Sequence, residues 1–401
     1  MSVVSGSAEV RGVPSPPSPP LHRVSFPAAA PPRPVTLPNS TPAWLVTRYQ
    51  DVRRVLTDPR FGRAELYADD APRAGGTPNV ADTPASMFNQ DGPDHLRLRR
   101  TVQHAFTPRT VEVWRPWVAS VVEQLIDDLV DAGPPLDVVA AFTHPLPFTV
   151  MSRLMGLEEL QPEQLRHWAR YAFANDTPAT GEEAEVGAEF REFAAGLLGD
   201  RRGRPGDDLV SSLVLAADED GGIPEEQLVH LVCGLVAGGN DSATASIGNA
   251  LVYLLGERRE NWPRLADADL AETASERLLH SIPIGDDESG TRRAAEDVEI
   301  GGVTIPAGSV VAVSFGSANR DPAVFPPERA GDLFAPLEAP TMAFGAGQHF
   351  CLGAWLMRTQ LHLSLHRLAA RLPGLRLTEP VQSIVWHRST TRSPLRLPVA
   401  W

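Results

Sequence analysis

The sequence contains no lysine, so all 36 of its Lys and Arg residues are arginines. The 50 acidic residues outnumber them and leave a net charge of −14, which argues against binding nucleic acid through an overall positive field. Cysteine is also scarce, with only Cys233 and Cys351 present. Two cysteines exclude a disulfide framework and indicate a reducing compartment.

Long apolar runs are absent as well. No apolar stretch reaches the roughly 18 residues that a membrane-spanning helix requires. The N-terminal residues MSVVSGSAEVRG lack the positive region and apolar stretch of a secretory signal. Hydrophobic residues still make up 42% of the chain, which is enough for a sizeable core and excludes a disordered chain. We therefore expect a soluble, cytoplasmic protein with no membrane or nucleic-acid partner.

The first 40 residues differ in composition from the rest, with ten prolines between Pro14 and Pro38. Because proline lacks a backbone donor, we expect residues 1–40 to form no regular strand ladder but an extended arm, lying on the body or partly disordered. Nothing demands a boundary after that, so residues 41–401 are predicted to form one domain.

Apolar residues at helical spacing dominate this domain. Helices are predicted over residues 51–56, 95–106, 111–129, 142–157, 162–171, 182–198, 207–217, 224–255 and 351–371. Runs of β-branched residues predict strands at 298–300, 303–305 and 310–313. The expected fold class is mainly α with a small β portion.

The strongest chemical signal is the segment 344–353, Phe-Gly-Ala-Gly-Gln-His-Phe-Cys-Leu-Gly. A cysteine at the start of a helix gains from the helix dipole and from free backbone amides, which lower its pKa and favour the thiolate. Glycines on both sides, Gly345 and Gly353, let the backbone approach a flat group closely. A lone cysteine beside a glycine-rich turn is more often a core residue, but the whole pattern favours a ligand. Cys233, among Leu and Val, is predicted to be a core residue.

These ten residues resemble the haem-thiolate signature of the cytochrome P-450 superfamily, in its soluble actinobacterial form. The resemblance implies a single triangular domain that binds haem b (iron protoporphyrin IX), with Cys351 as the iron ligand and Phe344, Gly345 and Gly353 against the haem. It also implies a monomeric monooxygenase, or an oxidative coupling enzyme, acting on a small natural-product substrate with O2. Electrons would come from ferredoxin and ferredoxin reductase.

Four basic residues extend the resemblance. His95 and Arg99 are four residues apart, so they share one face of a helix that looks like the family's third. In the family these positions bind the haem propionates, and Arg292 and His349 match two further propionate ligands. Four basic groups from three distant segments fit a dianionic cofactor.

The long predicted helix is interrupted by Gly238-Gly239-Asn240-Asp241-Ser242. Such a run is locally costly in a helix, which indicates either a local distortion or a tight helix–helix crossing. The resemblance places the family's oxygen-binding notch here, with Asp241 and Ser242 as the acid and the alcohol that deliver protons. Serine replaces the more usual threonine.

The segment 274–283 departs from the family pattern. Arg277 and His280 stand where the family has the Glu and the Arg of a buried ion network. Glu276 and His280 are four residues apart and could pair instead, or His280 could face solvent.

Substrate selection is expected from residues 64–90, 160–205 and 282–287. The residues expected to line the substrate pocket, each of which could equally belong to the hydrophobic core, are Met87, Phe88, Val236, Ile284 and Ile384. Three arginines, Arg100, Arg109 and Arg358, flank the expected proximal side of the haem. They form either a patch for an acidic ferredoxin or scattered solvated charges.

A second hypothesis is a haem-binding, P-450-like accessory protein that stabilises a partner biosynthetic enzyme without redox chemistry. The altered Arg277 and His280 positions favour it, and the complete cysteine segment opposes it. A reduced carbon monoxide complex with the red-shifted band of the family would distinguish the enzyme from the scaffold.

Overall fold

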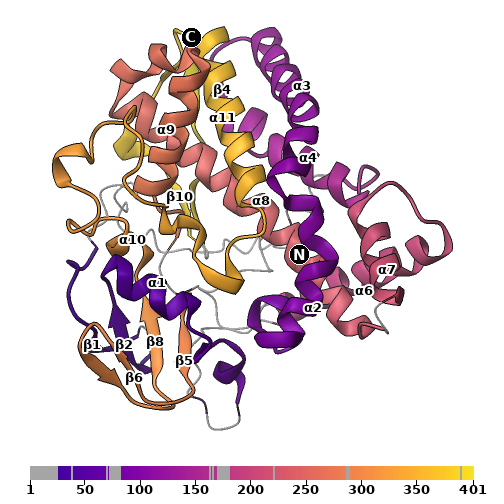
Figure 1. The fold of residues 1–401 in the computed structure, drawn as a ribbon. Coiled ribbons are helices and arrows are strands. Elements are labelled where there is room, and N and C mark those ends of the chain that lie inside the picture. The colour runs from indigo at the N-terminus through magenta and orange to yellow at the C-terminus, as the bar shows by residue number, and fades with distance from the viewer. Residues whose placement is uncertain are drawn as a thin grey trace, which may run out of the picture.

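The computed structural model describes residues 26–37, 39–68, 71, 83–161, 164, 167–168, 181–219, 222–285, 290–388 and 391–401. Helices make up most of this part, and the strands gather mainly at one corner (Figure 1). The predicted class, mainly α with small sheets, is confirmed. The α-helices are α1 (Tyr49–Thr57), α2 (Gly92–Val102), α3 (Pro108–Ala132), α4 (Pro145–Met155), α6 (Gly181–Gly203), α7 (Leu209–Glu219), α8 (Glu225–Gly256), α9 (Ala268–Ser281), α10 (Phe315–Ala318) and α11 (Ala354–Arg371). Among the described residues, no helix is long and apolar enough to cross a membrane.

The largest sheet has the order β1-β2-β8-β5-β3. Its β2–β8 pair is parallel, whereas the other three pairs are antiparallel. Smaller sheets have the orders β4-β12-β9, β10-β11 and β6-β7. The strands are β1 (Arg33–Thr36), β2 (Pro42–Val46), β3 (Phe61–Gly62), β4 (Leu136–Asp137), β5 (Arg292–Ala294), β6 (Val298–Ile300), β7 (Val303–Ile305), β8 (Val310–Val313), β9 (Arg376–Leu377), β10 (Trp386–Arg388), β11 (Arg392–Pro394) and β12 (Pro398–Ala400).

The proline-rich arm contributes one of these strands. Residues 33–36 form β1, which pairs with β2 so that Arg33 lies opposite Leu45. The expectation that the arm forms no regular ladder is wrong at this point. Proline is tolerated at an edge strand, where only one side of the backbone must hydrogen-bond. Residues 1–25 lie outside the described part, and a boundary at residue 40 stays a prediction.

The predicted strands at 298–300, 303–305 and 310–313 match β6, β7 and β8. The helix predicted over 224–255 matches α8 to within one residue at each end. The last helix begins later than predicted, at Ala354, with Gly353 as its N-cap. Cys351 therefore lies in the loop that precedes α11. The helix predicted over 162–171 lies largely outside the described residues.

Helix α8 organises the larger core and packs against α4, α6 and α11. Its two adjacent glycines serve different purposes. A Cβ on Gly239 would lie 2.6 Å from Sδ of Met151 in α4, so a side chain at this position would displace Met151 where the two helices pack closely. A Cβ on Gly238 would meet no atom within 4 Å. Close packing therefore explains Gly239, whereas Gly238 has a different cause.

Helix α3 offers a matched test of the core. Ile126 is fully buried, whereas Val113 of the same helix is 77% exposed. Ile126→Ala should lower the free energy of unfolding by about 2–5 kcal/mol through lost burial and the cavity left behind. Val113→Ala should change it by at most roughly 0.5 kcal/mol. Denaturant unfolding of the two variants measures the difference, and equal losses would contradict this packing.

Candidate active site

The segment 344–353 forms a closed loop ahead of α11. The backbone amide of Cys351 donates to the carbonyl oxygen of Phe344 at 2.9 Å. Gly345 and Gly347 have φ values of +67° and +72°, which favour glycine. A Cβ on Gly347 would also collide with the backbone carbonyl of Leu56, at the end of α1. Both the bend of this cysteine loop and its contact with α1 therefore depend on Gly347.

Arg99, from α2, holds the cysteine loop from the other side. Its Nη1 donates to the carbonyl oxygen of Gln348 at 2.9 Å, and its Nη2 donates to that of Phe350 at 2.7 Å. The family resemblance implied that Arg99 binds the haem propionates. The structure directs two of its donors to the loop, on both sides of His349, and a role at the propionates stays a prediction.

Cys351 is an exposed residue, yet the protein atoms packed around its thiol desolvate it. This burial raises the pKa of the thiol, against the opposing effects of the Gly353 amide and of the Arg99 and Arg358 charges. The expectation of a pKa lowered by the helix start is therefore wrong for the polypeptide alone. Cys351 precedes α11 rather than beginning it, and desolvation outweighs the favourable groups.

His95 and His349 lie together beside Asp91. The centroids of the two imidazole rings are 4.4 Å apart, and Nε2 of His349 is 3.0 Å from Oδ1 of Asp91. Asp91 also accepts the backbone amides of Arg63 and Ala64 at 2.6 and 2.7 Å. Burial acts to raise the pKa of Asp91, but these hydrogen bonds hold it below its usual value. Burial lowers the pKa of His95 to about 4, so its imidazole is neutral at pH 7.

Two buried guanidinium groups complete this cluster. Arg292, in β5, is only 3% exposed, and burial, then the neighbouring Arg63, lowers its pKa to about 9. Arg63 donates to Oδ1 of Asn89 at 3.2 and 2.9 Å and to the carbonyl oxygen of Thr291 at 3.3 Å. Arg63 was not among the predicted site residues, because nothing local in the sequence distinguishes it from the other arginines.

This cluster carries a surplus of positive charge. Arg63 and Arg292 lie beside one carboxylate, Asp91, and Arg99 lies beside His95. Nδ1 of His95 is buried with no hydrogen-bond partner among the described residues. Buried charge is costly unless an opposite charge accompanies it. The residues present therefore fit a group that brings two carboxylates, as the propionates of haem do.

Asp241 and Ser242 lie in α8, and both are partly buried. The hydroxyl of Ser242 donates to the carbonyl oxygen of Gly238 at 2.7 Å, and the hydroxyl of Ser246 donates to the carbonyl oxygen of Ser242 at 2.8 Å. Gly238 therefore takes part in a side-chain hydrogen bond within the helix. The role of the two residues in proton delivery stays a prediction.

The expected pair of Glu276 with His280 is wrong. Glu276 binds Arg358 of α11, with Nε and Oε1 2.5 Å apart. His280 does not face solvent either, since it is 6% exposed and its ring centroid lies 4.4 Å from that of Phe325. The two side chains extend from α9 toward different neighbours, so the spacing of four residues did not bring them together.

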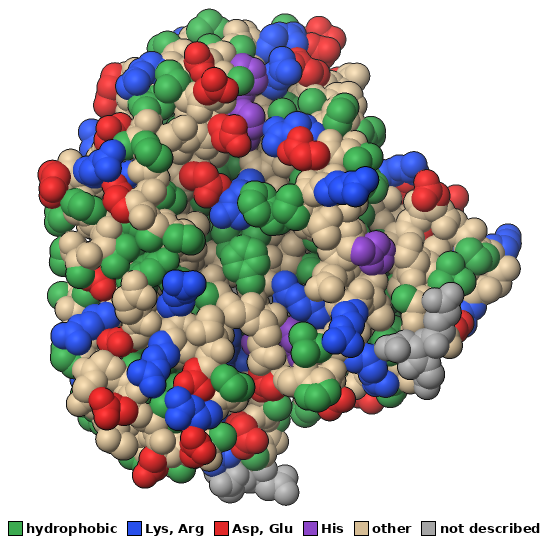
Figure 2. All heavy atoms as spheres, in the orientation of Figure 1, with side chains coloured by type: hydrophobic (Ala, Val, Ile, Leu, Met, Phe, Trp, Pro, Cys, Tyr) green, Lys and Arg blue, Asp and Glu red, His purple; other side chains and the backbone are tan. Residues whose placement is uncertain are grey.

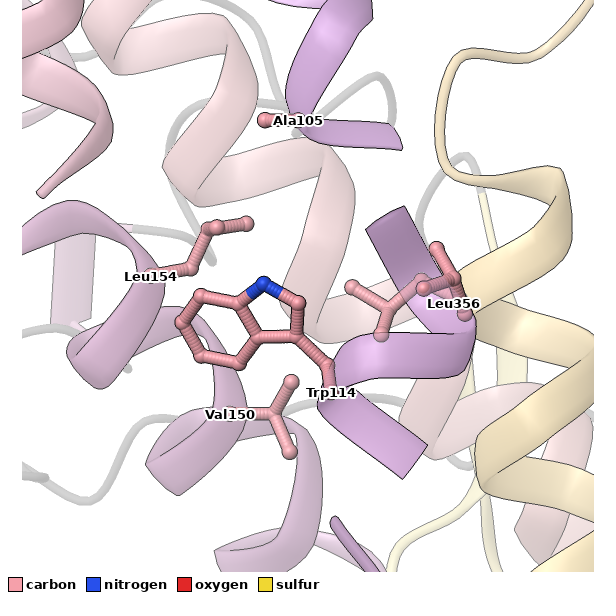
Figure 3. Close-up of a pocket in the computed structure, with 6 residues that line it drawn as sticks. Ala105, Trp114, Val150, Leu154 and Leu356 are labelled. Atoms are coloured by element: carbon pink, nitrogen blue, oxygen red, sulfur yellow. The ribbon is translucent and has the colours of Figure 1, made fainter. Parts of the chain in front are cut away.

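The candidate substrate walls are only partly described. Val236 and Ile384 are buried, Met87 and Ile284 are partly buried, and Phe88 is 42% exposed beneath the Arg63 guanidinium. Parts of the predicted segments 64–90, 160–205 and 282–287 lie outside the described residues. The cavity drawn in Figure 3 holds about 10 Å³, which is space for roughly one water molecule and not for a substrate.

The close contact of Gly347 generates a prediction about the loop. Gly347→Ala should destabilise the protein more than Gly302→Ala does. Both positions have positive φ, which costs a residue with a side chain roughly 1–2 kcal/mol, but a Cβ on Gly302 would meet nothing within 4 Å. Thermal unfolding of the two variants gives the comparison. Equal shifts in Tm would mean that the Leu56 contact is unimportant.

Comparison with known proteins shows similarity along nearly the whole chain. Residues 283–372 match the family described as cytochrome P-450. The chain is 40% identical to nocardicin C N-oxygenase of Nocardia uniformis subsp. tsuyamanensis, over 92% of each chain. It is also 40% identical to the mycinamicin IV hydroxylase/epoxidase of Micromonospora griseorubida, over 91% of each. A solved cytochrome P-450 with biaryl coupling reactivity superposes with a TM-score of 0.83 at 36% identity, covering 90% of each chain. With such similarity along nearly its whole length, the chain belongs to the cytochrome P-450 family.

Proposed function

We propose that this P-450 monooxygenase oxidises a small natural product, by oxygen insertion or by oxidative coupling, with O2 and ferredoxin-supplied electrons. The cysteine loop set against a buried basic cluster carries the proposal, because it combines a thiolate donor with groups for two propionates. The family implies haem as the cofactor, and the chain is related to enzymes that tailor natural products. Among the compared proteins are an N-oxygenase and a biaryl-coupling enzyme, which supports both reaction types for this chain.

The bound haem supplies the iron centre at which O2 is activated. Cys351 would be the iron ligand in this proposal. A thiol that coordinates a metal is deprotonated outright, so ligation overcomes the raised pKa of Cys351. Arg99 keeps the loop in place through its two carbonyl contacts. Arg358 lies 4.5 Å from the ring of Phe344 and limits the positions which that ring adopts.

His95, Arg292 and His349 bind the propionates, and Arg63 adds positive charge beside them. Asp91 orients His349 by holding its Nε2, which leaves Nδ1 for the cofactor. Gly345 and Gly353 allow the loop backbone to approach the macrocycle closely. In this arrangement the surplus charge of the cluster is neutralised when haem binds.

Asp241 carries protons from solvent, and the hydroxyl of Ser242 passes them on. A hydroxyl has one hydrogen to donate, and that of Ser242 is donated to Gly238. To relay a proton, the hydroxyl would turn from Gly238, release this hydrogen to the next acceptor and take up another from the side of Asp241. Serine lacks the methyl group that restricts χ1 of threonine. Its orientation is therefore fixed less firmly than that of the family's usual residue.

The electron donor is proposed to be an acidic ferredoxin, reduced by its reductase, that docks near α11. An open depression of about 350 Å³ lies there between α3, α9 and α11, and Trp355 beside it is 43% exposed. Arg358 does not belong to a free basic patch, because it pairs with Glu276. Arg100 and Arg109 remain exposed candidates. Basic and acidic side chains are interspersed on the face in Figure 2. The positive charge for docking would therefore come from a few neighbouring arginines and not from the whole face.

We propose a cytoplasmic monomer.

Replacement of the ligand tests this function. Cys351→Ala should abolish the red-shifted band of the reduced carbon monoxide complex, and with it substrate oxidation supported by ferredoxin and its reductase. Cys233→Ala is the matched control, since Cys233 is fully buried in the core and should keep both. A Cys351→Ala protein with the band and activity of the parent would reject the proposal.

Proton delivery is tested by product formed per reducing equivalent, with peroxide quantified alongside. Asp241→Asn should slow turnover by about 10²–10⁴-fold, the usual contribution of a positioned proton donor, while substrate binding persists. Ser242→Ala should keep consuming reducing equivalents but release more peroxide per product. Ser242→Thr should couple as well as the parent or better. Unaltered coupling in Ser242→Ala would exclude this hydroxyl as the relay.

A further inference from the structure

Arg277 is a buried cation at the C-terminal half of α9. It is 2% exposed, and its guanidinium donates to three oxygens of one segment. The acceptors are the carbonyl oxygens of Ala335 and Pro336 at 2.8 and 2.7 Å and Oε1 of Glu338 at 2.9 Å. Because the guanidinium fork is rigid, three acceptors fix the segment 335–338 in both position and direction.

Glu338 is the anion that compensates Arg277. Its side chain is 15% exposed and lies between Arg277 and Arg329, with the Arg329 contact at 3.4 Å. Burial acts to raise the pKa of Glu338, but the hydrogen bond and charge of Arg277 lower it below its usual value. The carboxylate is therefore ionised at pH 7, and its Oε2 is buried without a hydrogen-bond partner among the described residues.

His280, one turn further along α9, adds no charge to this contact. Burial, and then the charges of Arg277 and Arg320, lower its pKa to about 4, so the imidazole is neutral at pH 7. Its carbonyl oxygen accepts from Nδ2 of Asn319 at 3.1 Å. At this end of α9, the ion pair of Arg277 with Glu338 is thus the charged link to the segment 335–338.

This segment leads directly into the cysteine loop. Asn319 also donates to the hydroxyl of Thr341 at 3.1 Å and accepts from the amide of Met342 at 2.8 Å. The carbonyl oxygen of Met342 in turn accepts the amide of Gly345 at 2.9 Å. Hydrogen bonds therefore connect α9 to the turn at which the loop begins, and Glu338 lies only four residues before Met342.

We propose that Glu338 is a positioning residue, whose ion pair with the buried Arg277 holds the cysteine loop where Cys351 can ligate haem. The inference rests on the proposed ligation by Cys351. In this contact the negative charge comes from Glu338 in the segment 335–338, and the positive charge comes from Arg277 in α9. Loss of the negative charge leaves Arg277 buried and uncompensated, so the segment moves to let the guanidinium reach solvent.

The test compares variants that separate charge from shape. Glu338→Gln keeps the side-chain length but removes the charge. It should lose haem to apomyoglobin at least fivefold faster than the parent, and part of its reduced carbon monoxide complex should lack the red-shifted band. Glu338→Asp keeps the charge and should release haem within about twofold of the parent rate. Glu328 is an exposed glutamate that precedes the segment 335–338. Glu328→Gln is therefore the control and should match the parent.

Arg277→Glu adds the opposite change, because it places a second carboxylate beside Glu338. It should retain less haem than Glu338→Gln does. Equal rates and spectra in the Gln and Asp variants would overturn the inference, since the charge would then be irrelevant. If Cys351→Ala loses the red-shifted band while Glu338→Gln behaves as the parent, only the role of Glu338 fails. A Cys351→Ala protein that keeps the band removes the proposed function itself.

Discussion

The burial of positive charge is the constraint on which this site depends. Arg63 and Arg292 lie beside a single carboxylate, Asp91, and Arg99, from a third part of the chain, lies beside His95 in the same cluster. Guanidinium groups keep their charge at neutral pH, so a protein cannot bury them without anions or carbonyl oxygens. In the proposed site, the propionates of haem would supply the missing anions. Binding of the cofactor and completion of the fold around it are therefore expected to be coupled.

Arginine also supports the cysteine loop, on two sides. Arg99 of α2 donates to the carbonyl oxygens of Gln348 and Phe350, and Arg277 of α9 holds the segment that precedes the loop. A planar fork with several donors suits this task better than a single ammonium group does. In a chain without lysine, the same residue type is thus proposed to serve both cofactor binding and the positioning of the ligand.

Sequence patterns predicted the parts of the fold that depend on local spacing. The limits of α8, the strands β6 to β8 and the glycine-rich cysteine loop follow from residues adjacent in the chain. Partners across the fold could not be predicted in this way. Glu276 binds Arg358, 82 residues away, rather than His280 in its own helix, because the packing of α9 against α11 decides which side chains meet. The contribution of Arg63 likewise depends on tertiary placement alone.

The central claim is that the chain binds one haem through a cysteine thiolate within this basic cluster. The absorption spectrum of the purified protein, reduced and exposed to carbon monoxide, tests it most directly when haem is quantified per chain. The account predicts one haem per chain and the red-shifted band that thiolate ligation produces. A colourless protein, or a haem complex without that band in the unmodified chain, would contradict it.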